Sequence, residues 1–278
     1  MRVDAHVHVW RLARSDYGWL APTAKLAPIY RDFDLDDVRP CLRGAGGRAI
    51  VLVQAAPTVG ETRFLLDTAR GSGGLVRGVV GWADLASPEA PDTLGELSAD
   101  PLLRGVRPML QDLDDPRWIT RVQVAPALRA LSRLDLRLDA LVTPRELPAL
   151  LEMLRQHSDL TVVVDHCAKP DIAHTLWQPW ADDIAAIAAT TSAYCKLSGL
   201  VTEARRGWTV EDLRPYVEHV LASFGTDRVI WGSDWPVLTL AGSYADWLAA
   251  SEALLGGLSQ CEREGIFGGN AQRFYGLE

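Results

Sequence analysis

The chain has 278 residues, of which 48% are hydrophobic and 23% are charged, and its formal net charge at pH 7 is −8. A globular protein of this length buries most of its apolar surface, and one α/β barrel of this size is as ordinary as two small domains. The negative charge argues against nucleic acid or an anionic membrane as the main partner, because both attract basic surfaces.

The sequence carries no pattern that predicts export or membrane insertion. A charged segment followed by an apolar one is missing near the N-terminus, and no run of about 18 apolar residues occurs. The four cysteines, at positions 41, 167, 195 and 261, have no CxxC or other metal-ligand spacing, which is typical of reduced thiols. We therefore expect a cytoplasmic protein.

Short apolar runs recur along the chain, and each is followed by a longer segment of helical character. The eight runs span residues 2–10, 49–56, 75–84, 103–110, 136–142, 161–167, 193–199 and 228–236. Two of the segments between them begin with helix-start signals, namely Thr143-Pro144 and the pair Thr209 and Asp212, which resembles a capping box. Strands that alternate with helices and read as nearly continuous apolar runs favour a parallel sheet that is covered on both faces.

We predict a single (β/α)8 TIM barrel domain that spans residues 1–278. An open, doubly wound sheet is the alternative architecture. It is disfavoured because the glycine-rich stretches at residues 43–49 and 70–76 precede strands, and neither forms a GxGxxG phosphate turn.

The first predicted strand, VDAHVHVW at residues 3–10, carries two histidines two positions apart. Because strand side chains alternate between faces, we expect Asp4, His6, His8 and Trp10 on one face and the alanine and valines on the other. A single histidine is often a core residue that binds a carbonyl group or a carboxylate. Two imidazoles on the same face of an apolar strand are costly to bury without a purpose, so the pair indicates a functional site.

Further polar and aromatic residues fall near the ends of the predicted strands, where TIM barrels carry their active sites. These residues are Gln54, Trp82, Asp84, Arg107, His166, Lys196, Ser198, Asp234 and Trp235. Structural roles remain as alternatives: Arg107 and Lys196 can form ion pairs, and Trp82 and Trp235 can pack in the core. Asp165 and Lys169, which flank His166, can also pair with each other.

The motifs VDAHVHVW, RGVRPMLQ, VVDHCAKP, KLSGL, VIWGSDWPV and NAQRFYGL run from residue 3 to residue 277. In this order they resemble the amidohydrolase superfamily and, within it, the amidohydrolase-2 group of lactone hydrolases, which open sugar lactones and related lactones. The resemblance implies a central site made of His6, His8, His166 and Asp234. It also implies that Arg107 lies near the substrate carbonyl, and it places Lys196 and Ser198 in the motif of strand seven.

The sequence departs from superfamily members that bind two metal ions. Those members bridge their ions with a lysine or glutamate on strand four or five, where this chain offers Arg107 and, in LRLDALV, Asp139. The four residues of the central site, His6, His8, His166 and Asp234, match the nitrogen and oxygen ligands of one divalent ion with an open position, and zinc is the first choice. We therefore expect at most one ion per chain. The resemblance leaves open whether activity depends on it.

Hydrolysis of a lactone needs a water nucleophile, a base and positive charge at the carbonyl oxygen. We predict Asp234 as the general base, and Arg107, His166 or a bound metal ion as the group that polarises the carbonyl. Predicted substrate-binding residues are Gln54, Trp82, Lys196 and Trp235, with Trp10 as a further aromatic platform.

Because only one arginine is placed at the rim, we expect a neutral aldonolactone, such as L-fuconolactone or a related one, rather than a dicarboxylate lactone. The alternatives are a metal-dependent decarboxylase of an aromatic or enoic acid on the same fold and, from another class, a binding protein that has lost turnover. No oligomeric state is predicted.

Overall fold

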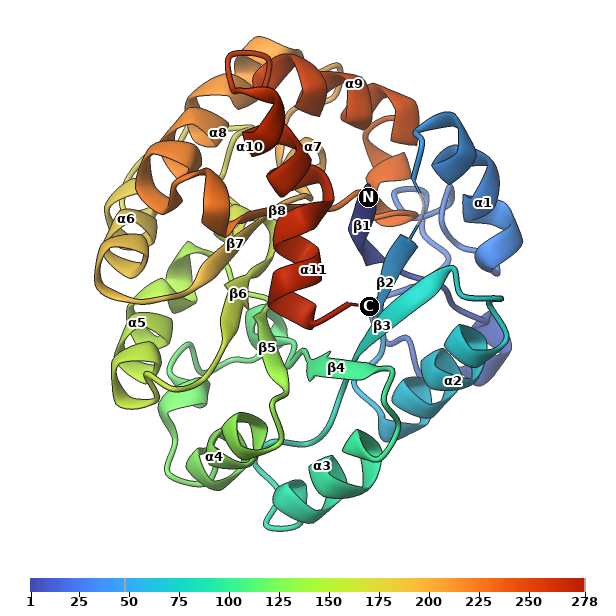
Figure 1. Cartoon of the computed structure of the whole chain (residues 1–278), viewed down its shortest axis with the longest axis vertical. Coiled ribbons are helices and arrows are strands. Elements are labelled where there is room, and N and C mark those ends of the chain that lie inside the picture. The colour runs from blue at the N-terminus through green and yellow to red at the C-terminus, as the bar shows by residue number, and fades with distance from the viewer. Residues whose placement is uncertain (48, 278) are drawn as a thin grey trace.

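The computed structural model describes residues 1–47 and 49–277, and within them eight parallel strands form one sheet in chain order. The strands are β1 (Val3–Val7), β2 (Ala49–Val53), β3 (Val76–Gly81), β4 (Leu103–Val106), β5 (Arg137–Ala140), β6 (Val162–Val164), β7 (Tyr194–Leu197) and β8 (Val229–Trp231). The sheet curves round until β8 meets β1 (Figure 1). There, the His8 amide donates to the Trp235 carbonyl at 2.7 Å, and the Asp234 amide donates to the His6 carbonyl at 2.9 Å. The predicted TIM barrel is confirmed, and each predicted strand is present.

Helices surround the sheet, as Figure 1 shows. They are α1 (Leu35–Gly44), α2 (Val59–Arg70), α3 (Ala90–Ser98), α4 (Ala125–Arg133), α5 (Leu147–Gln156), α6 (Trp180–Thr190), α7 (Leu200–Glu203), α8 (Val210–Phe224), α9 (Tyr244–Leu254), α10 (Gln260–Glu264) and α11 (Asn270–Tyr275). The capping box of Thr209 and Asp212 begins α8, and Thr143 caps the short helix Pro144–Glu146 that leads into α5. Both predicted helix-start signals are therefore confirmed.

The apolar core has two layers. The larger layer lies between the strands and the surrounding helices, and the smaller one fills the barrel with residues such as Val51, Val163 and Ile230. The short helix α11 adds Phe274 and Tyr275 to this inner layer, and it lies across the end of the barrel at which the strands begin (Figure 1). The carboxyl ends of the strands therefore form the open end of the barrel.

Strand β1 contains a bulge that changes which face its side chains occupy. Asp4 pairs with Ile50 and Val7 with Leu52, so Ala5 and His6 together face the single residue between these two on β2. Asp4 consequently points outward, where one of its carboxylate oxygens accepts the Ser233 amide at 2.8 Å. The prediction of one shared face is therefore wrong for Asp4.

Trp10 also departs from the predicted face. The strand ends at Val7, so its alternation does not extend to residue 10. The Trp10 ring is fully buried against Phe33, at a centroid distance of 5.3 Å, and its indole nitrogen donates to the Arg31 carbonyl at 2.7 Å. Of the four residues predicted on one face, His6 and His8 alone lie on the side of the site, and Val3 and Ala5 also face the inner layer.

Among the described residues, no helix is both long enough and apolar enough to cross a membrane. All four cysteines are free. The free cysteines agree with the expectation of reduced thiols, and the cytoplasmic location stays a prediction.

Candidate active site

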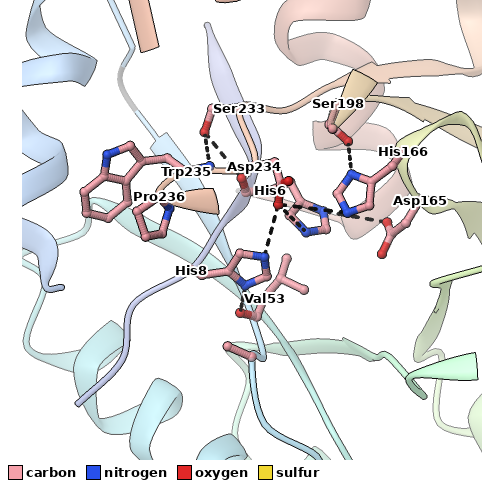
Figure 2. A network of polar contacts seen from close by, with 12 residues as sticks. His6, His8, Val53, Asp165, His166, Ser198, Ser233, Asp234, Trp235 and Pro236 are labelled. Atoms are coloured by element: carbon pink, nitrogen blue, oxygen red, sulfur yellow. Dashed lines mark hydrogen bonds and ion pairs between the residues drawn. The ribbon is translucent and has the colours of Figure 1, made fainter. Parts of the chain in front are cut away.

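Three histidines converge on one carboxylate at the carboxyl ends of the strands. His6 and His8 come from β1 and the residue after it, His166 follows β6, and Asp234 follows β8. The Nε2 atoms of His6, His8 and His166 lie 3.7, 3.3 and 3.9 Å from Asp234 Oδ1 (Figure 2). All four side chains are at least nine-tenths buried. The structure thus brings together the four residues of the predicted central site.

The backbone at two of these residues is left-handed. Asp234 has a φ of 61°, and four consecutive residues that are not glycine, beginning with His166 at a φ of 53°, form a left-handed turn after β6. Such residues cost roughly 1 kcal/mol or more each, and they cluster at functional sites. The Trp180 indole supports the turn by donating to the Cys167 carbonyl at 2.7 Å. Backbone strain is therefore part of what aims His166 and Asp234 at each other.

The hydrogen bond of His8 fixes its tautomer. Its Nδ1 lies 2.7 Å from the Val53 carbonyl oxygen, which only accepts, so Nδ1 carries the proton. Burial lowers the pKa of His8 and so favours a neutral ring. Asp234 acts in the opposite direction, but its effect is smaller than that of burial. The lone pair of Nε2 then points toward Asp234, as a metal ligand or a hydrogen-bond acceptor requires.

His166 is held by the two residues that follow β7. The Ser198 hydroxyl oxygen lies 2.9 Å from His166 Nδ1 (Figure 2), and a Cβ atom at Gly199 would lie 2.6 Å from the imidazole ring. Gly199 also has a φ of +68°, so a side chain is excluded both by its backbone and by the ring. Burial, with Lys169 and Arg107 nearby, lowers the pKa of His166 well below its ordinary value and keeps the ring neutral.

Arg107 follows β4 and is held in place by backbone and side-chain contacts. Its guanidinium donates to the Gln54 carbonyl, and the Gln54 side chain donates to the Arg107 carbonyl at 2.7 Å. Arg107 NH1 lies 3.4 Å from His6 Nε2 and 3.7 Å from Asp165 Oδ2. Burial, with the Lys196 ammonium and Arg107 nearby, lowers the pKa of His6 well below its ordinary value.

A cavity of about 150 Å³ opens above the histidines. Its lining consists of His8, Trp19, Ala55, Arg107, Met109, Gln111, Asp112, Leu141, His166, Lys169, Asp234 and Val237. This volume is below the roughly 300–1,000 Å³ of pockets for drug-sized ligands, so it suits one small ring. The three predicted catalytic residues, Arg107, His166 and Asp234, all line it.

The four predicted substrate-binding residues lie outside this lining. Gln54 is buried against Arg107, and Lys196 is buried below the histidines. Trp235 packs against Phe33 at a centroid distance of 5.2 Å. The Thr62 hydroxyl donates to the Trp82 carbonyl at 2.9 Å and accepts the Trp82 amide at 2.7 Å.

The cavity contains polar and aromatic residues that the sequence interpretation did not assign to the substrate. Trp19 comes from the long segment between β1 and α1, and its indole donates to the Ala55 carbonyl at 2.7 Å. Gln111 and Asp112 belong to a short helix after β4, and Lys169 ends the left-handed turn. Only their position in the sequence could have predicted this, because each of them lies in a connection that follows the carboxyl end of a strand.

Two overlapping groups of side chains fit a metal ion. One consists of His6, His8 and Asp234, and the other of His6, Asp165 and His166, with ligand atoms within 4.8 Å of one another in each group. Neither carboxylate oxygen of Asp165 accepts a hydrogen bond from any other described residue, although both are buried. Neutral imidazoles and a buried carboxylate without a hydrogen bond are the donor chemistry of a zinc site, so these residues fit the predicted ion.

Comparisons with known proteins find similar sequences and structures over nearly the whole chain. The sequence model of the family described as Amidohydrolase matches residues 3–277. An L-fucono-1,5-lactonase from Burkholderia ambifaria is 45% identical over 281 residues, which cover 100% of this chain and 96% of that protein. A crystal structure of an amidohydrolase from Burkholderia multivorans with bound zinc is 35% identical, covers 100% of both chains and has a TM-score of 0.92.

A decarboxylase is a more distant neighbour. The structure of 2,6-dihydroxybenzoate decarboxylase with 2,6-dihydroxybenzoate has a TM-score of 0.72 over 99% of both chains at 14% identity, which shows a shared fold alone. The family match, by contrast, extends over nearly the whole sequence and includes every residue of the site. This chain belongs to the amidohydrolase family.

Proposed function

We propose that this protein hydrolyses a sugar-acid lactone of the L-fucono-1,5-lactone type to the open-chain acid. The observation that carries the proposal is the Asp234 carboxylate in the cavity wall, with three imidazole nitrogens within 3.9 Å and Arg107 in the same wall. The 45% identity to an L-fucono-1,5-lactonase over the full chain supports the same substrate class.

Asp234 takes the proton from the attacking water. Its carboxylate faces the cavity, and His8, whose Nδ1 proton is committed to Val53, presents its Nε2 atom to the same oxygen. As the water oxygen bonds to the lactone carbonyl carbon, the proton passes to Asp234. When the ring C–O bond breaks, the protonated Asp234 returns this proton to the departing alkoxide.

Arg107 and His166 lie where the carbonyl oxygen gains negative charge. Both line the cavity, and both are fixed by hydrogen bonds made on the side away from it. Donors held in place before the reaction stabilise an oxyanion without having to reorganise. A divalent ion held by His6, His8 and Asp234 would add positive charge that polarises the same carbonyl group.

The charges in the cavity wall suit a neutral substrate. Arg107 and Lys169 are balanced there by Asp112 and Asp234, and Lys169 also lies 3.7 Å from Glu203. A dicarboxylate lactone would need an excess of positive charge.

We assign the sugar contacts to residues in the wall. Trp19 is the aromatic platform and Gln111 is a hydroxyl-binding group. In this proposal Gln54 and Lys196 act through Arg107 and His6, respectively, rather than by touching the sugar. Direct contact of Trp82 or Trp235 with the sugar would need a wider cavity.

A screen with a pH indicator tests the proposal, because hydrolysis of any lactone releases a proton. L-fucono-1,5-lactone and other aldonolactones should be hydrolysed well above the uncatalysed rate, and a dicarboxylate lactone should not. Asp234→Asn protein serves as the blank for spontaneous ring opening. Activity confined to dicarboxylate lactones, or release of carbon dioxide from aromatic acids, would overturn the proposal.

A further inference from the structure

A second polar cluster lies inside the barrel, below the cavity. It consists of Asp139 on β5, Asp165 after β6, Lys196 on β7 and Tyr275 on α11, all with no exposed surface. Lys196 donates to Asp139 Oδ2, and its Nζ lies 3.1 Å from both Asp165 Oδ1 and His6 Nδ1. Tyr275 donates to the same Asp139 oxygen at 2.7 Å. The ammonium group is thus enclosed by two carboxylates and one imidazole.

The side chains around the Lys196 ammonium are ones that could also bind a metal ion. His6 and Asp165 belong to the inner metal-binding group, which His166 completes, and Lys196 Nζ lies beside the first two. We propose that the Lys196 ammonium is a resident cation that competes with a divalent ion for His6 and Asp165, and so limits the number of ions the chain holds.

The direction of the Lys196 hydrogen bond supports this competition. An ammonium group only donates, so His6 Nδ1 is the acceptor and its lone pair is occupied by Lys196. The same nitrogen lies 3.7 Å from Asp165 Oδ1, so an ion held between His6 and Asp165 would have to displace this hydrogen bond. His8 is the opposite case, since its Nδ1 donates to Val53 and its Nε2 is free. Lys196 therefore acts on the one residue that the two metal-binding groups share.

Electrostatics act in the same direction. A divalent ion on Asp165 would meet Lys196 and also Arg107, whose NH1 lies 3.7 Å from Asp165 Oδ2. Repulsion between cations is strong in a site that excludes water. Without Lys196, the Asp139 and Asp165 carboxylates lose their nearest positive charge, and a divalent ion can neutralise them.

The test replaces Lys196 by methionine, which keeps a long side chain and removes the charge. Wild-type and Lys196→Met protein are dialysed against zinc chloride, and bound zinc is counted by mass spectrometry. We expect one more zinc ion per chain in the variant, and a rise in Tm with zinc that exceeds the rise in the wild type. Equal counts and equal zinc-dependent shifts in Tm would overturn the proposal.

Lys169→Met is the matched control, because it removes a lysine of the cavity wall that pairs with Glu203 and forms no ion pair with His6 or Asp165. Its zinc count should equal that of the wild type, and a gain here as well would show that any lost positive charge has the same effect. If Lys196→Met does not fold, the double variant Lys196→Met/Asp139→Asn removes one positive and one negative charge together. It should also gain one ion, and failure to gain it, or failure of both variants to fold with zinc present, counts against the proposal. The zinc count does not depend on which lactone is hydrolysed, so the proposal can fail while the proposed function stands.

Discussion

Asp234, the proposed general base, has an unusual left-handed backbone conformation. Asparagine is among the residues that adopt a left-handed φ at low cost, so Asp234→Asn should keep the φ of 61° and fold normally. Its amide cannot take up the proton of water. We expect kcat to fall by about 10²-fold to 10⁴-fold with an unchanged Tm, measured on the same sample. A destabilised but active variant would remove Asp234 from the mechanism.

Gly199 and Ser198 allow two ways of disturbing His166 to be compared. Gly199→Ala places a Cβ atom 2.6 Å from the imidazole ring and strains a φ of +68°, so both Tm and kcat should fall. Ser198→Ala removes only the hydrogen bond to Nδ1, which we expect to cost roughly 1 kcal/mol of stability and less activity than Gly199→Ala. Equal activity of Gly199→Ala and the wild type would mean that His166 does not need its present position.

The residues of the site were predictable where a motif and a strand end coincided. His6, His8, Arg107, His166 and Asp234 meet both conditions, and the structure brings them together. The tryptophans were not predictable in this way. An indole near a strand end can pack inward or outward with similar burial of apolar area, and the choice depends on neighbours that are distant in sequence.

At the scale of single elements, the segment between β1 and α1 depends on a buried carboxyl group. This segment brings Trp19 into the cavity wall, and Glu61 of α2 anchors it by accepting the Tyr17 hydroxyl at 2.9 Å. Glu61 also accepts the Ala55 amide at 3.2 Å and lies 3.3 Å from Arg14. Burial raises the pKa of Glu61 to about 7.

This pKa predicts a pH-dependent stability. Between the unfolded pKa of about 4.3 and the folded value, the folded protein holds a proton that the unfolded chain releases, so rising pH lowers the free energy of unfolding, by up to about 4 kcal/mol. The fall in Tm from pH 5 to pH 8 should therefore be smaller in Glu61→Gln than in the wild type. Glu96→Gln, at an exposed position of α3, is the control and should leave the fall unchanged. The same fall in all three proteins would contradict the assignment.

The strands and helices were easier to predict from the sequence than the irregularities within them. Eight apolar runs and the helix-start signals at Thr143 and Thr209 were sufficient for strands, helices and barrel closure. The bulge in β1 was not visible, because Val3, Ala5 and Val7 are apolar and both faces of a barrel strand are buried. When both faces accept apolar residues, alternation does not fix the phase of a strand.

At the scale of the whole molecule, the C-terminal helix reaches the polar cluster below the site. α11 lies across the end of the barrel at which the strands begin, and its Tyr275 hydroxyl donates to Asp139. Tyr275→Phe leaves the buried carboxylate with one donor fewer, which should lower the free energy of unfolding by about 1–3 kcal/mol and lower Tm. The control Tyr194→Phe removes a hydroxyl from a ring that packs on Phe274 of the same helix, and it should change Tm less. Equal shifts would assign the effect to packing.

Because of its bulge, β1 changes, within five residues, which of its side chains face the inside of the barrel. Before the bulge, Asp4 belongs to the outer shell, where Ser233 and Tyr244 of α9 bind its carboxylate, and after it the histidines belong to the site. An engineer who grafts the first strand of this barrel onto another scaffold must therefore transplant the irregularity together with the motif. A regular strand with the same sequence would turn either Asp4 or the two histidines to the wrong side. The protein would then lose either the contact of Asp4 with α9 or the histidines of the site.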